Sequence, residues 1–158
     1  LRSGRGIGGR ASTVGYGLWA LDLAGKPADE TTTAMVEFLL KNQTDNGRWS
    51  PPSNRPPLEE SEVTATVVAA YYLQTFAIDE KNDDIEKSQQ KALAWLDQAK
   101  LTSHEDRVMR LYGLSVLENT SDKPVAEKAV RLRDEILTAQ HEDGGWSQRK
   151  RTRSVKRF

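Results

Sequence analysis

The chain contains no cysteine, which excludes disulfides, thiolate metal sites and a cysteine nucleophile. It has only two histidines, His104 and His141, and no third ligand is spaced to complete a metal site with them. We therefore expect neither a metal nor a cofactor. No apolar run approaches the ~18 residues of a membrane-spanning helix, so we expect no transmembrane segment.

Acidic residues are missing from both ends of the chain, although the net charge of the whole is zero. The last ten residues carry six basic ones: Arg149, Lys150, Arg151, Arg153, Lys156 and Arg157. Such a run can bind nucleic acid or anionic lipid. However, it has no helical period, so we interpret 149–158 as a basic tail and expect no nucleic-acid partner. Residues 1–12 are expected to be extended or disordered. The start at Leu1 instead of Met indicates a segment of a longer protein.

Apolar residues recur with helical spacing between these ends, and no stretch alternates as a half-buried strand does. The pattern predicts an all-α domain over residues 13–148, with six helices in three hairpins. The expected helices cover residues 13–23, 31–43, 59–76, 85–99, 103–117 and 124–140. Ser103 and Asp106 are spaced as a capping box for the fifth helix. The loop over 44–58 holds four prolines, which exclude helix there.

A seven-residue pattern, Gln-x-x-x-Gly-x-Trp, occurs twice, each time directly after a predicted helix. Its two copies are Gln43, Gly47 and Trp49, and Gln140, Gly144 and Trp146. The copies lie about 97 residues apart, or two hairpin repeats of about 48. The segment Ala94–Gln98 resembles the helix-end half of the motif and is interpreted as a degenerate middle repeat.

The motif has a physical interpretation as a staple between hairpins. A glutamine at a helix end can bridge the unpaired carbonyls of its own helix to backbone groups of the next one. Glycine lets the chain reverse, and tryptophan covers the amide while its N–H finds a polar partner.

The pattern resembles the QW repeat of squalene-hopene and oxidosqualene cyclases, in the prenyltransferase and squalene-cyclase repeat superfamily. The resemblance covers roughly residues 11–148. It implies an α/α toroid in which the first, third and fifth helices line an inner cavity and the others form an outer ring. Three hairpins make only a partial or open toroid. We therefore expect self-association, or contact with missing domains of a longer chain. The resemblance also points to a bacterial source.

The resemblance suggests one catalytic candidate and one set of ligand-binding residues. Glu62, in the segment Glu60–Ala65, falls where class II terpene cyclases place the aspartic acid that protonates a polyprene, although the segment has Glu and Val where those enzymes have Asp. Aromatic side chains stabilise carbocations, and those on the inner helices are the substrate-binding candidates. These are Tyr16, Trp19, Tyr71, Tyr72 and Tyr112.

Three functional hypotheses follow. The first is a squalene-cyclase-like repeat domain, related to isoprenoid chemistry but without catalytic competence in this segment, whose partner is a hydrophobic isoprenoid or lipid. The second is an active class II terpene cyclase segment, an intramolecular isomerase, with Glu62 as the proton donor. The third is a non-enzymatic α/α scaffold that binds a peptide or lipid.

Overall fold

A computed structural model describes residues 9–51, 61–118 and 121–148 of the chain. The described residues form six α-helices and one short 3-10 helix, with no strand among them. The α-helices are α1 (Arg10–Leu23), α2 (Glu30–Asn42), α3 (Glu62–Thr75), α4 (Asn82–Gln98), α5 (His104–Leu117) and α6 (Lys123–Thr138). The predicted all-α class is thereby confirmed.

Helix starts follow the sequence signals closely. The predicted capping box of α5 is present, because Ser103 Oγ accepts from Asp106 N at 3.0 Å and Asp106 Oδ2 accepts from Ser103 N at 2.8 Å. Three starts differ from expectation by three residues each. Helix α3 begins at Glu62 instead of residue 59, because Ser61 is its N-cap and Ser61 Oγ accepts from Thr64 N. Helix α1 begins at Arg10, where Gly9 provides a left-handed N-cap. Helix α4 begins at Asn82, because the polar stretch before it folds into the 3-10 helix η1 (Asp79–Lys81).

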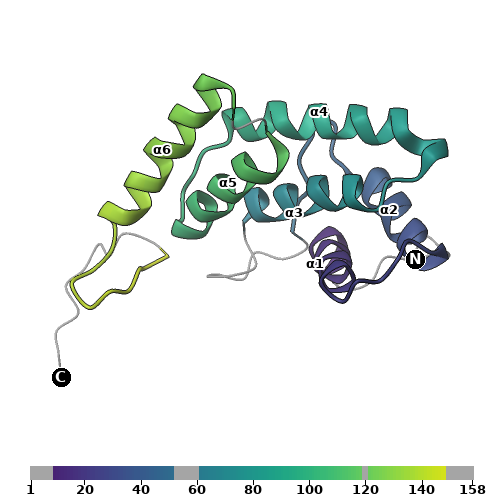
Figure 1. Cartoon of the computed structure of the whole chain (residues 1–158), viewed down its shortest axis with the longest axis horizontal. Coiled ribbons are helices and arrows are strands. Elements are labelled where there is room, and N and C mark those ends of the chain that lie inside the picture. The colour runs from purple at the N-terminus through teal and green to yellow at the C-terminus, as the bar shows by residue number, and fades with distance from the viewer. Residues whose placement is uncertain (1–8, 52–60, 119–120, 149–158) are drawn as a thin grey trace.

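The helices pack as an array of hairpins. Helix α3 packs between α1 and α5, while α2 packs against α1, α4 against α3 and α6 against α5 (Figure 1). Helix α3 is also in contact with α2 and α4. Ten of its 14 residues are buried, as expected for the middle of an array. The packing is compatible with a helical repeat.

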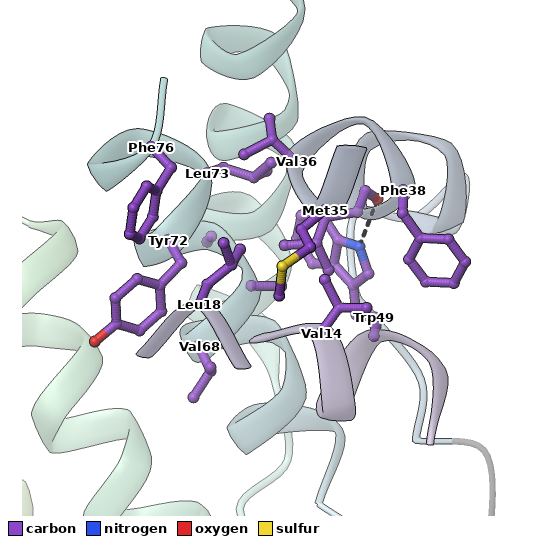
Figure 2. Packing of buried hydrophobic residues seen from close by; sticks show 14 of the residues in the cluster. Val14, Leu18, Met35, Val36, Phe38, Trp49, Val68, Tyr72, Leu73 and Phe76 are labelled. Carbon is purple, nitrogen blue, oxygen red and sulfur yellow. Dashed lines mark hydrogen bonds between the residues drawn. The ribbon is translucent and has the colours of Figure 1, made fainter. Parts of the chain in front are cut away.

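The main hydrophobic core joins the first hairpin to α3. Figure 2 shows Val14 and Leu18 of α1 against Met35 and Val36 of α2, with side chains of α3 closing the other side. Trp49, from the loop after α2, is fully buried in this core. The first motif therefore lies inside the folded array, where removal of its indole costs packing as well as a hydrogen bond.

Candidate functional site

The two Gln-x-x-x-Gly-x-Trp motifs fold into the same loop. Gln43 Nε2 donates to the Gly47 carbonyl at 2.8 Å, and Gln140 Nε2 donates to the Gly144 carbonyl at 2.7 Å. Gly47 and Gly144 have positive φ angles of 94° and 82°, a backbone conformation that is strained for any residue with a side chain. The two loops are thus built by the same hydrogen bonds and the same backbone turn.

The indole ring of each motif tryptophan folds back onto the helix that precedes its loop. Trp49 Nε1 donates to the Leu39 carbonyl at 2.9 Å, and Trp146 Nε1 donates to the Ile136 carbonyl at 2.7 Å. The Leu39 carbonyl belongs to the last turn of α2, where carbonyls lack an intrahelical partner. The assignment of helix-end capping to the glutamine was therefore wrong, because the indole, with its longer reach, occupies that position.

The first motif also binds the next hairpin. Gln43 Nε2 donates to the Ser88 carbonyl at 2.8 Å, and Ser88 Oγ donates back to Gln43 Oε1 at 2.8 Å. The backbone N–H of Trp49 donates to Thr66 Oγ1 at 3.0 Å. A Cβ on Gly47 would lie 2.3 Å from the Lys91 carbonyl oxygen, so the loop rests directly on the α4 backbone. These contacts tie α2 to both α3 and α4, in agreement with the predicted staple.

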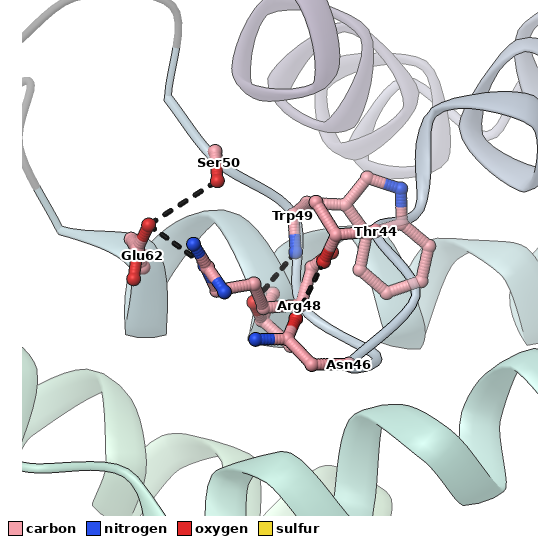
Figure 3. Close-up of polar contacts among 7 residues, drawn as sticks. Thr44, Asn46, Arg48, Trp49, Ser50 and Glu62 are labelled. Carbon is pink, nitrogen blue, oxygen red and sulfur yellow. Dashed lines mark hydrogen bonds and ion pairs between the residues drawn. The ribbon is translucent and has the colours of Figure 1, made fainter.

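Glu62 begins α3 and faces the same loop. Its Oε1 accepts from Arg48 Nε at 2.8 Å and from Ser50 Oγ at 3.2 Å, and the side chain is 40% exposed (Figure 3). These contacts fit a carboxylate that anchors the motif loop to the start of α3. Its role as a proton donor stays a prediction. Glu60 lies outside the described residues.

A polar cluster joins the start of α3 to the start of α5. Asp106 Oδ1 accepts from Ser61 Oγ at 2.8 Å, and Glu105 Oε1 accepts from Thr64 Oγ1 at 2.7 Å. Burial alone would raise the pKa of Asp106. Hydrogen bonds from Ser61, Ser103 and Thr102 outweigh burial, so this pKa lies below its ordinary value. Asp106 is therefore a structural acceptor, although sequence analysis placed it only in a capping box.

The predicted ligand-binding aromatics are brought together. Trp19 stacks on Tyr16 of its own helix at 6.0 Å and on Tyr112 of α5 at 6.1 Å between ring centroids. Tyr71 of α3 meets Tyr112 edge-on at 6.5 Å. Beneath them Tyr72 is buried, 6.3 Å from Trp19. We call Tyr16, Trp19, Tyr71 and Tyr112 the ring surface. Tyr16 is exposed and the other three are half-buried.

Two carboxylates, Glu105 and Asp22, act on the pKa values of tyrosines of the ring surface. Burial, and then the charge of Glu105, raises the pKa of Tyr16. Burial, followed by Tyr71 and Asp22, raises the pKa of Tyr112. These hydroxyls therefore stay neutral, and the surface combines π-faces with the negative charge of Glu105 and Asp22 nearby. Such a surface favours a neutral or cationic ligand over an anionic one.

A second repeat, shared by α1 and α5, was missed by sequence analysis. Tyr16-Gly17-Leu18 in α1 recurs as Tyr112-Gly113-Leu114 in α5, and both leucines are fully buried. Each sequence places its tyrosine on the ring surface. The recurrence, about 96 residues apart, matches the motif spacing and could have identified α1 and α5 as equivalent helices.

A groove of about 470 Å³ lies between α2 and α4, and most of the residues that line it are charged. The charged residues are Glu37, Lys41, Lys81, Asp84, Lys87 and Lys91, and the Gln43–Ser88 contact lies beside them. The groove does not include the ring surface. A groove of this composition does not suit the apolar ligand that the aromatics predict.

No helix among the described residues is long and apolar enough to cross a membrane, as the sequence predicts. The same residues contain no cluster of metal-ligating side chains. Comparison with known proteins found no matching family model, no matching curated protein and no matching solved structure.

Proposed function

We propose that this chain is a squalene-cyclase-like α/α repeat domain that binds a hydrophobic ligand of the isoprenoid or lipid class on its ring surface. The observation that carries the proposal is the convergence of four aromatic side chains from α1, α3 and α5, with three of the rings half-buried and one exposed. Stacked aromatics supply apolar area at low conformational cost. The repeated motif supports the family assignment, because its two copies form the same loop.

The charges of Asp22 and Glu105 narrow the class of ligand that we expect to bind. Asp22 and Glu105 lie close enough to the ring surface to influence its tyrosines. A neutral isoprenoid alcohol or an isoprenoid amine is therefore expected to bind better than an isoprenoid diphosphate of the same length. The difference arises because the two carboxylates repel an anionic headgroup.

Tryptophan fluorescence tests the proposal. Trp19 is the only tryptophan on the ring surface, so farnesol should change its emission saturably. The Trp19→Phe variant should lose that signal. Tyr112→Leu removes a stacking partner and is expected to weaken binding about tenfold. Trp95→Phe, on α4, is the matched control and should leave the titration unchanged. Equal titrations of wild type and Tyr112→Leu would contradict the proposal.

The cyclase hypothesis needs a separate experiment. A class II cyclase segment converts a polyprene, and Glu62→Gln abolishes that conversion without unfolding the chain. Glu30→Gln, at the equivalent first position of α2, is the control for removal of a helix-start carboxylate. Conversion that survives Glu62→Gln excludes Glu62 as the proton donor. Farnesol binding without any conversion favours the non-catalytic domain.

A further inference from the structure

The groove between α2 and α4 concentrates positive charge between the first and second hairpins. Its lining comes from α2, η1 and α4 and has four lysines but only two carboxylates. The chain around it has the opposite balance, because residues 11–148 hold all 23 acids and only 14 of the 23 basic residues. The groove is therefore a positively charged site in an acidic helical array. Its lysines are Lys41, Lys81, Lys87 and Lys91.

The chain does not neutralise these lysines itself. Within the described part of the chain, no ion pair includes any of the four, although Glu37 and Asp84 line the same groove. Lys87 and Lys91 lie one turn apart on α4, a spacing at which two like charges destabilise a helix. An anion that binds in the groove would offset this repulsion.

The first Gln-x-x-x-Gly-x-Trp motif fixes the two sides of the groove relative to each other. Gln43 and Ser88, which both line the groove, exchange two hydrogen bonds of 2.8 Å between α2 and α4. The Lys91 backbone packs against Gly47, where a Cβ would lie only 2.3 Å from the Lys91 carbonyl oxygen. Lys41 on α2 is thereby held across the groove from Lys91 on α4. A ligand needs to order side chains here but not the backbone, which lowers the cost of binding.

The residue types of the lining indicate the class of anion. Lysine binds phosphate as a point charge, whereas arginine is the better match for a planar carboxylate. The described residues that line the groove include no arginine and no aromatic side chain, so none of them can stack on a nucleobase. A volume of about 470 Å³ is that of a small-molecule site. Four lysines facing two carboxylates match a compact ligand with several negative charges.

We infer that this groove, which we call the lysine groove, binds a small ligand that carries two or more phosphate groups. Such groups occur both in free solutes and in lipid headgroups. Acidic residues are exposed along η1 and the start of α4, and they repel an anionic membrane surface more than a small solute that enters the groove. These residues are Asp79, Glu80, Asp83 and Glu86. The geometry therefore favours the free solute. The inference does not rest on the ligand proposed for the ring surface, because the two sites share no residue.

Isothermal titration calorimetry of the full chain with inorganic tripolyphosphate tests the inference. We expect saturable binding that weakens as sodium chloride is added, because salt screens exposed charges. Lys87→Gln combined with Lys91→Gln should weaken binding about tenfold or more, since two charged donors are lost. Lys41→Gln should weaken it about threefold or more, because Lys41 reaches the ligand from α2. Far-UV circular dichroism verifies that each variant is folded.

The basic tail provides the matched control, because it also attracts anions. Lys150→Gln combined with Lys156→Gln removes the same two charges from residues 149–158 and should leave the affinity unchanged. If the tail pair weakens binding as much as the Lys87 and Lys91 pair does, or if the latter pair has no effect, the groove is not the site. Wild-type chain that does not bind tripolyphosphate also overturns the inference.

Vesicles distinguish the two sources of the phosphate groups. The chain is mixed with phosphatidylcholine vesicles that contain phosphatidylinositol bisphosphate, and the vesicles are sedimented. The fraction of bound chain should be the same for wild type and for the variant with Lys87→Gln and Lys91→Gln. Vesicle binding that is lost in this variant, without binding of tripolyphosphate to wild type, would contradict the assignment of a free solute.

Discussion

Replacing Asp106 by alanine removes the acceptor of hydrogen bonds that hold two helix starts together. Its Oδ2 accepts from the backbone N–H groups of Thr102 and Ser103 and from the Thr102 hydroxyl, and its Oδ1 accepts from Ser61 Oγ. Asp106, Ser103 and Ser61 are buried, whereas Thr102 is exposed. The partners at Thr102 can regain water after the substitution, but Ser103 N and Ser61 Oγ cannot do so without local opening.

The expected loss of stability follows from the two buried donors, Ser103 N and Ser61 Oγ, that are left without an acceptor. A buried polar group without a partner costs about 1–3 kcal/mol, so Asp106→Ala is expected to lower the free energy of unfolding by roughly 3–4 kcal/mol. For a chain of this length that corresponds to a fall in Tm of roughly 10 °C. Asp106→Asn keeps an amide oxygen for the two backbone donors and should cost only about 1–2 kcal/mol.

Urea unfolding followed by far-UV circular dichroism measures both variants. The pKa of folded Asp106 lies below its ordinary value, so its stabilising contribution is complete above about pH 4 and is lost as pH falls through the folded-state pKa. The difference in free energy of unfolding between wild type and Asp106→Asn should therefore become smaller under strongly acidic conditions. A loss below about 1 kcal/mol for Asp106→Ala would refute the reasoning, because a single helix cap accounts for that much.

Two further pairs of variants use the internal repeats as their own controls. Trp49→Phe should lower the free energy of unfolding by about 2–3 kcal/mol, whereas Trp146→Phe should lower it by less than about 1 kcal/mol, because only the first indole is buried. Equal losses for the two variants in urea titrations would show that burial does not decide the difference. Gly113→Ala should destabilise by about 1–2 kcal/mol, since its Cβ would lie 2.8 Å from a methyl group of the buried Val67. Gly17→Ala should be neutral or raise Tm slightly, because its Cβ would meet only the terminal methyl of the Met35 side chain, at 2.9 Å, and this flexible side chain can adjust. A Tm rise at both positions would contradict this account.

Local features were predictable from the sequence because their causes are local. The capping box of Ser103 and Asp106 depends on residues three apart, and the turn at Gly47 depends on one residue's freedom at positive φ. Helix existence followed from apolar spacing in the same way. The start of α4 was misplaced because a polar stretch gives no apolar period, and Asp79–Lys81 folded into η1.

Contacts between hairpins were not predictable with the same certainty. Nothing near Gln43 in the sequence indicates Ser88 as its partner, 45 residues away. The ring surface was predicted residue by residue from the idea of an inner layer. Its stacking of Trp19 on Tyr112, and the carboxylates beside it, depend on how α1 and α5 close around α3.

Helix α6 buries only Leu132 among its 16 residues. Elements with few buried contacts open locally at a free energy well below that of global unfolding, so the amide protons of α6 should exchange with solvent much faster than those of α3. Helix α3 packs against α1, α2, α4 and α5, so we expect it to lose its protection only when the whole array unfolds. The chain therefore combines a cooperative centre with an end that opens independently, and this gradient in exchange rates should flatten wherever another hairpin covers α6.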